Sequence, residues 1–223
     1  GGRASAARPR SPVLITPTPA STLLIVCDTQ ERWRGPFEDG SADDGKIADA
    51  IESCAMLARA ASVLKMRTIS AKQDSEYYGE TMAEIAAELP QDATVVERTT
   101  FSAMTNEVVD AVEEAAESDE GLNGVVVCGM EIHGAVLQTA LDLLRHGTNV
   151  FVPIDCVASR PGREADFDAA IQMLEAAGAV ITTAETLLLQ LVPDTKSEFF
   201  GEVGQMLELE GEGDDAADDD DEQ

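Results

Sequence analysis

Long apolar runs are missing from this sequence of 223 residues, and the two most prominent, at residues 22–27 and 125–128, are short. A helix needs about 20 apolar residues to cross a bilayer, so we expect no membrane span. Hydrophobic residues make up 44% of the chain, which is ordinary for a water-soluble protein. The length fits one domain with appendages.

Cysteine is scarce, and no pair of cysteines or histidines has the spacing of a metal site. Three of the four cysteines lie inside or beside apolar, strand-like runs. We predict that all four are small buried side chains: Cys27, Cys54, Cys128 and Cys156. A chain without a disulfide framework suits a reducing compartment, which includes both the cytosol and the mitochondrial matrix.

Basic residues are few, with 15 Lys and Arg against 43 Asp and Glu. Ten of the acids lie in residues 208–223, and without them the net charge of −28 becomes about −18. Such a domain repels a phosphate backbone, so RNA contact is expected only through a local basic segment. The amino-terminal arm is the one such segment visible in the sequence.

That arm, residues 1–20, contains three arginines and no acid and is rich in Ala and Ser. It resembles the end of a cleaved organellar transit peptide, which predicts a mitochondrial protein. The alternative is an extension without targeting value on a cytoplasmic protein. We therefore divide the chain into the arm, a domain at 21–207 and an acidic, disordered tail at 208–223.

Between the arm and the tail, strand and helix patterns alternate. Apolar, β-branched runs predict six strands, at 22–27, 67–71, 94–98, 124–128, 149–154 and 179–182. Apolar residues at helical spacing predict helices at 47–64, 80–89, 106–117, 133–146, 163–177 and 184–191. This order indicates an α/β, three-layer Rossmann-like fold, with a six-stranded, mostly parallel sheet and helices on both faces.

Ligands in such folds bind beyond the carboxyl ends of the strands. Asp28, Arg98 and the turn at 129–135 follow or end predicted strands, so we expect them to meet in one crevice.

Five stretches distributed over the domain resemble the isochorismatase-like cysteine hydrolases, and in particular the eukaryotic isochorismatase-domain proteins. They also resemble a kinetoplastid group, some of which carry the name mitochondrial-associated ribonuclease. The stretches are LIVCDTQE at 24–31, ERTTFS at 97–102, VCGME at 127–131, DCVASR at 155–160 and TAETLLLQL at 183–191.

The resemblance implies a catalytic triad of Asp, Lys and Cys, in which a thiolate at a helix start attacks an amide or related carbon. Asp28 keeps the first position. Arg98 replaces the lysine, which preserves the positive charge but not the ability to release a proton. Ala135 replaces the nucleophile, because a methyl group cannot attack a carbonyl. We therefore expect no active catalytic residue at these three positions.

Other residues of the turn are expected to line the remaining pocket: Gly129, Met130, Glu131, His133 and Gly134. His133 is interpreted as a pocket-rim or interface residue. Cys128, in the strand before the turn, is interpreted as core rather than as a substitute nucleophile.

Some family members hold a divalent metal through an Asp/His/His cluster near the first Asp. Here Asp28 is followed by Thr-Gln-Glu-Arg-Trp-Arg, without histidine. We predict no metal and no cofactor.

Three functions remain open. The first is a pseudoenzyme that serves as a structural or accessory subunit of a larger mitochondrial assembly, with other protein subunits or further copies of itself as partners. The second is a hydrolase of vinyl ethers that uses Asp28 as a general acid, as in isochorismatases that lack the cysteine. Against it, Arg98 should lower the pKa of Asp28 and keep it ionised. The third is a nuclease, against which stand the acidic charge and the absent metal cluster.

Overall fold

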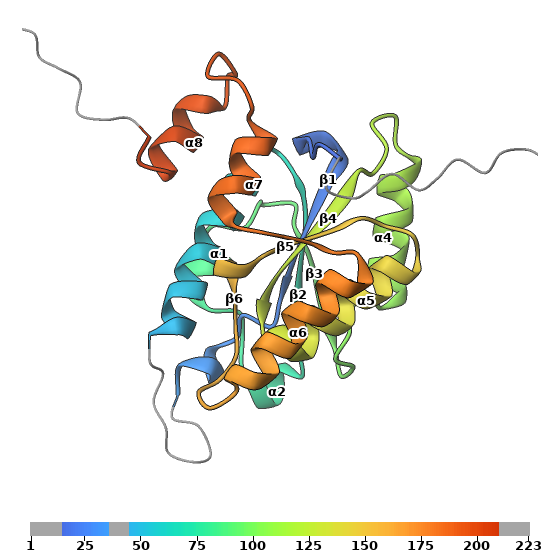
Figure 1. The fold of residues 1–223 in the computed structure, drawn as a ribbon, viewed down its shortest axis with the longest axis vertical. Helices are drawn as coiled ribbons and strands as arrows, with labels where there is room; N and C mark the ends of the chain where they lie inside the picture. The colour runs from blue at the N-terminus through green and yellow to red at the C-terminus, as the bar shows by residue number, and fades with distance from the viewer. Residues whose placement is uncertain (1–14, 36–44, 210–223) are drawn as a thin grey trace, which may run out of the picture.

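The computed structural model describes residues 15–35 and 45–209. Most of the predicted arm and nearly all of the acidic tail lie outside these ranges. Figure 1 shows a central sheet with helices packed against both of its faces, as the sequence predicted.

The sheet has seven strands, all parallel, in the order β3-β2-β1-β4-β5-β7, with β6 paired to β4. The bounds are β1 Thr22–Cys27, β2 Arg67–Gln73, β3 Thr94–Arg98, β4 Gly124–Met130, β5 Val150–Pro153, β6 Val157–Ala158 and β7 Val180–Thr182. The six predicted strands are confirmed. The predicted count was wrong by one, because the two residues of β6 are too few to produce a recognisable pattern.

The longer helices match the predicted ones in place: α1 Lys46–Val63, α4 Asn106–Glu117, α5 Leu137–Arg145, α6 Glu164–Ala177 and α7 Ala184–Leu191. Side chains alternate along the strands, so β1 sends Leu24 and Val26 towards α1 and α7. Leu23 and Ile25 point the other way, towards α4, α5 and α6. The core is thus two apolar layers separated by the sheet.

One helix prediction was wrong, and two short helices were missed. The helix predicted at 80–89 is reduced to α3, Ala83–Ala86, because Thr81 forms a β-bridge with Gln30 and the Met82 amide donates to the Thr29 carbonyl. Two short helices were not predicted, α2 Ser75–Tyr78 and α8 Phe200–Met206. Helices of four and seven residues are too short to show a clear periodicity.

The helix predicted at 133–146 begins as a π-helical turn, η4 Ile132–Val136, before α5 starts. Gly134 has non-helical dihedral angles there, φ −105° and ψ −106°. The strand-to-helix junction that carries Ala135 is therefore irregular.

None of the described helices is long and apolar enough to cross a membrane.

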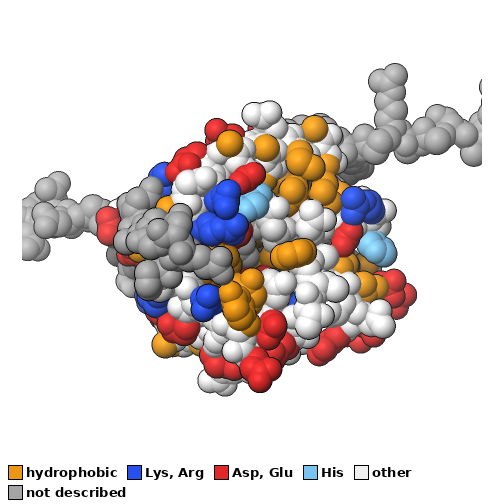
Figure 2. All heavy atoms as spheres, turned by 90° about the horizontal axis from the view of Figure 1, so that it is seen from below, with side chains coloured by type: hydrophobic (Ala, Val, Ile, Leu, Met, Phe, Trp, Pro, Cys, Tyr) orange, Lys and Arg blue, Asp and Glu red, His pale blue; other side chains and the backbone are white. Residues whose placement is uncertain are grey.

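The chain builds the sheet outward from β1 in both directions, first through β2 and β3, then through β4, β5 and β7. The strands β2 and β3 are added on one side of β1, and β4 is the first strand added on its other side. In folds of this kind, ligands usually bind beyond the carboxyl ends of the two strands between which this change occurs. Cys27 and Gly129 pair at the ends of these strands. Figure 2 views the molecule from the side on which the strands end, and basic and hydrophobic side chains are visible there among acidic ones.

Candidate functional site

Asp28 follows β1 directly and is the first residue beyond the sheet. Its backbone takes a left-handed conformation, φ 50°, and its amide donates to the Ala71 carbonyl at 2.8 Å. This bend turns the carboxylate into the structure, where the residue is only 4% exposed.

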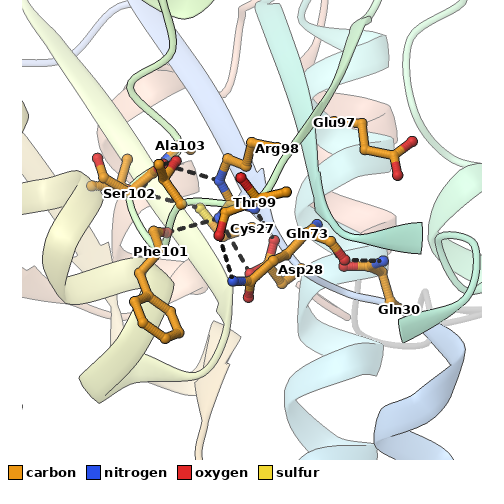
Figure 3. A network of polar contacts seen from close by, with 12 residues as sticks. Cys27, Asp28, Gln30, Gln73, Glu97, Arg98, Thr99, Phe101, Ser102 and Ala103 are labelled. Atoms are coloured by element: carbon orange, nitrogen blue, oxygen red, sulfur yellow. Dashed lines mark hydrogen bonds and ion pairs between the residues drawn. The ribbon is translucent and has the colours of Figure 1, made fainter. Parts of the chain in front are cut away.

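Arg98, at the end of β3, forms a two-pronged ion pair with Asp28. Its Nη1 and Nη2 donate to the two carboxylate oxygens at 2.8 and 3.2 Å, and Figure 3 shows the two side chains facing each other. The guanidinium also donates to the carbonyls of Phe101 (2.9 Å) and Ser102 (3.1 Å). Four hydrogen bonds therefore fix this group, which has five N–H bonds in all.

The predicted direction of the Asp28 pKa shift was wrong, although the predicted ionised state agrees with the structure. Burial raises the pKa of the Asp28 carboxyl to about 6, although Arg98 acts in the opposite direction. Desolvation therefore affects the pKa of Asp28 more than the ion pair does, whereas from the sequence we expected the ion pair to dominate. The carboxylate is still mostly ionised at neutral pH.

Ala135 lies in η4, at 2% exposure, one helical turn before Thr139. The Thr139 hydroxyl accepts a hydrogen bond from the Ala103 amide at 2.8 Å, and the Cys27 thiol points to it at 3.9 Å. Residues one turn apart share a helix face, so Ala135 faces the segments that carry the ion pair. The structure thus groups the ends of β1, β3 and β4, whereas the crevice expected between them stays a prediction.

Glu131, directly after β4, is held by its neighbours. Its carboxylate accepts from the Arg160 backbone amide at 3.0 Å and forms an ion pair with the Arg160 guanidinium. His133 Nδ1 lies 2.8 Å from the Ser159 hydroxyl, and its Nε2 lies 3.6 Å from Glu131. The turn at 131–133 is therefore bonded to the segment after β6.

The remaining predicted pocket residues have different environments. Met130 has no exposed surface and belongs to the core layer on the α1 side. Gly129 has φ +113°, and a Cβ there would lie 1.9 Å from the Cys27 carbonyl oxygen. Gly134 forms the irregular step in η4. Their pocket role stays a prediction.

Gln30, which was not predicted as a site residue, orders the rim of the site. The Gln30 side chain is fully buried, donates to the carbonyls of Gln73 (3.0 Å) and Gly79 (2.7 Å), and accepts from the Gln73 amide (2.9 Å). It holds α2 beside the loop after β1, where Tyr78 stacks on Trp33 with ring centroids 5.9 Å apart. Its place two residues after Asp28 was the available signal.

All four cysteines are buried, as predicted. Burial raises the pKa of the Cys27 thiol to about 12, and Cys128 packs in the core on the α1 side of the sheet. These environments disfavour a thiolate at either position.

Among the described residues, no group of three or more His, Cys, Asp or Glu side chains is placed to hold a metal ion. The residues near Asp28 therefore do not fit the metal cluster of some relatives. The absence of a cofactor stays a prediction.

A separate cavity of about 510 Å³ lies between the start of α1, the β6 segment and the start of α6. Its wall includes Ala50 and Ser53 of α1, and Asp155, Val157 and Arg160 from around β6. Because Arg160 also binds Glu131, it links the wall of this cavity to the turn that follows β4.

With this geometry in place, comparison with known proteins decides the family. A family model described as the isochorismatase domain matches residues 22–186. The chain belongs to the isochorismatase-domain family. It is 33% identical to isochorismatase domain-containing protein 2 of Xenopus laevis over 187 residues, 84% of this chain and 83% of the relative. It is 30% identical to isochorismatase domain-containing protein 1 of Danio rerio, over 86% of this chain and 62% of the relative.

Solved structures agree with this family. The MAR1 ribonuclease of Caenorhabditis elegans superimposes with a TM-score of 0.75 at 29% identity, over 85% of this chain and 91% of the other. A protein named putative MAR1 ribonuclease from Leishmania major gives 0.69 at 26% identity, over 85% and 92%. The Escherichia coli YcaC product, described as an octameric hydrolase of unknown specificity, gives 0.72 at 19% identity, over 86% and 90%, and supports the fold alone.

Proposed function

We propose that this protein is a catalytically degenerate member of the isochorismatase-domain family, which acts as a structural or accessory subunit of a larger mitochondrial assembly. The observation that carries the proposal is the state of the triad positions. Ala135 supplies no nucleophile, and Arg98 is committed to four hydrogen bonds that tie Asp28 to the loop after β3.

The chemistry of the Asp28–Arg98 ion pair supports a structural rather than a catalytic role. A guanidinium stays protonated at all accessible pH values, so Arg98 cannot take the proton that a lysine amine could. Because it is 5% exposed and bound on several sides, it has little freedom to follow a reacting group. Asp28 and Arg98 then act as a buried link between β1 and β3.

The mitochondrial location rests on the amino-terminal arm, whose arginines lie at positions 3, 8 and 10 with no acid among them. Partner subunits are proposed because the fold keeps both core layers although it lacks the nucleophile. Its folded surface can therefore still bind other proteins. Figure 2 shows aromatic or aliphatic side chains on the surface at the end where the strands finish, and Tyr77 and Phe101 are half or more exposed near the site.

One observation favours a second candidate, a hydrolase of vinyl ethers that uses Asp28 as general acid. The pKa of Asp28 is raised to about 6, so a protonated fraction exists near neutrality. The relatives named ribonuclease define a third activity to assay, which the net charge of −28 opposes.

Two experiments separate these functions. Purified protein is assayed on vinyl ethers, amides and single-stranded RNA beside the Asp28→Asn variant and a matched control, Asp92→Asn, which changes an exposed acid outside the site. We expect no turnover by any of the three. Turnover that Asp28→Asn abolishes and Asp92→Asn keeps would refute the pseudoenzyme.

The second experiment is native separation of mitochondrial extract, followed by detection of this chain and identification of co-migrating proteins. The proposal predicts migration in a large complex with other subunits. Exclusive migration as a free monomer or as a complex of its own copies, or absence from mitochondria, contradicts it.

A further inference from the structure

The cavity between the starts of α1 and α6 is separate from the triad positions. Its volume of about 510 Å³ is typical of pockets that hold small molecules. In Figure 1, β6 lies between these two helices, and the segment around β6 joins their walls. The described residues that line the cavity do not include Asp28, Arg98 or Ala135. The cavity is therefore a candidate binding site of its own.

The buried part of the cavity wall is apolar. Ala50 of α1 and Val157 and Ala158 of β6 belong to it, and none of the three is more than 4% exposed. Phe167 of α6 lines the cavity too, and it packs against the core layer on the α6 side. Because these side chains offer no hydrogen bond to water, an aliphatic or aromatic group gains free energy by replacing water there.

Charged residues of both signs line the more exposed part of the wall. The loop between β6 and α6 provides the guanidinium groups of Arg160 and Arg163. Acids come from both helices, with Asp49 in α1 and Glu164 and Asp168 in α6. A purely anionic or purely cationic molecule would be repelled by one of the two sets. A small molecule with one charge of each sign is attracted by both.

Several of these groups have capacity left for a ligand. Arg160 uses Nη1 to bind Glu131, and in the described part of the chain its other side-chain N–H bonds have no acceptor. The three acids of the helices form no ion pair with a described residue. Asp155, also in the wall, is already used, because both of its carboxylate oxygens accept from the Ala184 amide.

We propose that the cavity binds a free α-amino acid with a branched or aromatic apolar side chain. The ligand carboxylate accepts charge-assisted hydrogen bonds from Arg160, and the ligand ammonium group donates to the acids of α1 and α6. The ligand side chain packs on Ala50, Val157 and Phe167. The three parts of the wall thus recognise the three parts of the ligand, and no triad residue takes part.

Binding at Arg160 also affects the turn after β4. The guanidinium is shared between the ligand and Glu131, and the preceding residue, Ser159, is hydrogen-bonded to His133. An occupied cavity therefore changes the surroundings of the His133 ring. The other histidine of the chain, His146, is exposed at the end of α5 and does not line the cavity.

The test titrates the folded full-length chain with L-phenylalanine and L-leucine by calorimetry, beside molecules that each lack one part of the ligand. Hydrocinnamate lacks the ammonium group, phenethylamine lacks the carboxylate, and glycine lacks the apolar side chain. We expect saturable binding of the two amino acids at one site, and binding at least about tenfold weaker for each of the other molecules. No binding of the amino acids, or equal binding of any of the others, overturns the proposal.

Charge variants locate the bound ammonium group. The first variant removes the three acids of the helices that line the cavity: Asp49→Asn, Glu164→Gln and Asp168→Asn. The control removes three exposed acids of α4, outside the cavity: Glu107→Gln, Asp110→Asn and Glu113→Gln. Binding of L-phenylalanine should weaken about tenfold or more in the first variant and less than about twofold in the control. Equal effects in the two variants contradict the proposed site.

The two histidines give an independent readout by NMR. During titration of the wild-type chain with L-phenylalanine, the His133 ring signals should shift with the same midpoint as the heat of binding, and those of His146 should stay in place. An unresponsive His133, or an equal shift at His146, contradicts binding at Arg160. The wild-type titrations decide the proposal even if a variant does not fold.

Discussion

At the scale of single residues, three side chains determine what the site can do. In the proposed function, Ala135 stands where the family resemblance implies a cysteine nucleophile, and Arg98 stands where it implies a lysine. Asp28 keeps its place, but its carboxylate is bound by Arg98 on both oxygens. The sequence identified all three residues, whereas the balance between desolvation and attraction at Asp28 required the folded structure.

Arg98→Met should destabilise the protein by about 3 to 5 kcal/mol, because removal of one partner leaves the other charge buried without compensation. The measurement is the free energy of unfolding in urea, monitored by circular dichroism. Arg145→Met is the control, since Arg145 also pairs with an acid, Asp142, but is 66% exposed. We expect a change below about 1 kcal/mol there. Equal effects at both positions would contradict a structural role for the buried pair.

Asp28 should also leave a signature in the pH dependence of stability. Its pKa in the folded protein is about 6, above the ordinary 3.8. Between these values the folded state binds more protons than the unfolded state, so its contribution to stability is present below pH 4 and is lost as pH rises to 6.

The difference in unfolding free energy between wild type and Asp28→Asn should therefore fall by about 2 kcal/mol from pH 4 to pH 7. Urea unfolding of both proteins across this range measures it. If the difference in unfolding free energy instead increased with pH, Arg98 rather than burial would dominate the pKa of the Asp28 carboxyl group.

At the scale of elements, the site depends on how strands end. β1 ends in the left-handed bend of Asp28, and β4 passes close to β1 at Gly129. The strands and long helices were predictable, because their apolar periodicity extends over many residues. Helices α2 and α8 and strand β6 were not, because long-range contacts form them: Gln30, for example, reaches two carbonyls around α2.

Gly129→Ala should destabilise the protein by about 3 kcal/mol or more, because the added Cβ meets the Cys27 carbonyl oxygen of the neighbouring strand. Gly147→Ala is the matched control. Its φ is also positive, +81°, but no atom lies within 4 Å of the added Cβ, so it reports backbone strain alone. Thermal unfolding of the two variants should separate them clearly, and similar melting temperatures would rule out close strand approach as the reason for Gly129.

At the scale of the whole molecule, charge and core are distributed differently along the chain. Both core layers lie within the described part of the chain, and Val203 in α8 is the last buried hydrophobic side chain there. Residues 210–223 contain nine acids and no base. The stability of the fold should therefore not depend on residues 210–223, whereas these residues contribute about a third of the net charge.

Deletion of residues 210–223 should leave the unfolding free energy unchanged within about 0.5 kcal/mol, because every core residue in the described part of the chain is kept. It should reduce the net charge from −28 to about −19 and shift elution from an anion exchanger to lower salt. Urea unfolding and ion-exchange chromatography measure the two effects. A large loss of stability would mean that the domain extends into the tail.

The sequence by itself determined the fold class and the family resemblance, and it led to the proposal that the nucleophile is lost, because these depend on residue identity and on short-range periodicity. The tertiary structure decided what residue identity cannot encode: that four hydrogen bonds hold Arg98, that burial outweighs its charge at Asp28, and that three cysteines far apart in the sequence pack in one core layer. Each of these depends on how completely water is excluded and on which atoms meet across the sheet, and both are set only when the whole chain has packed.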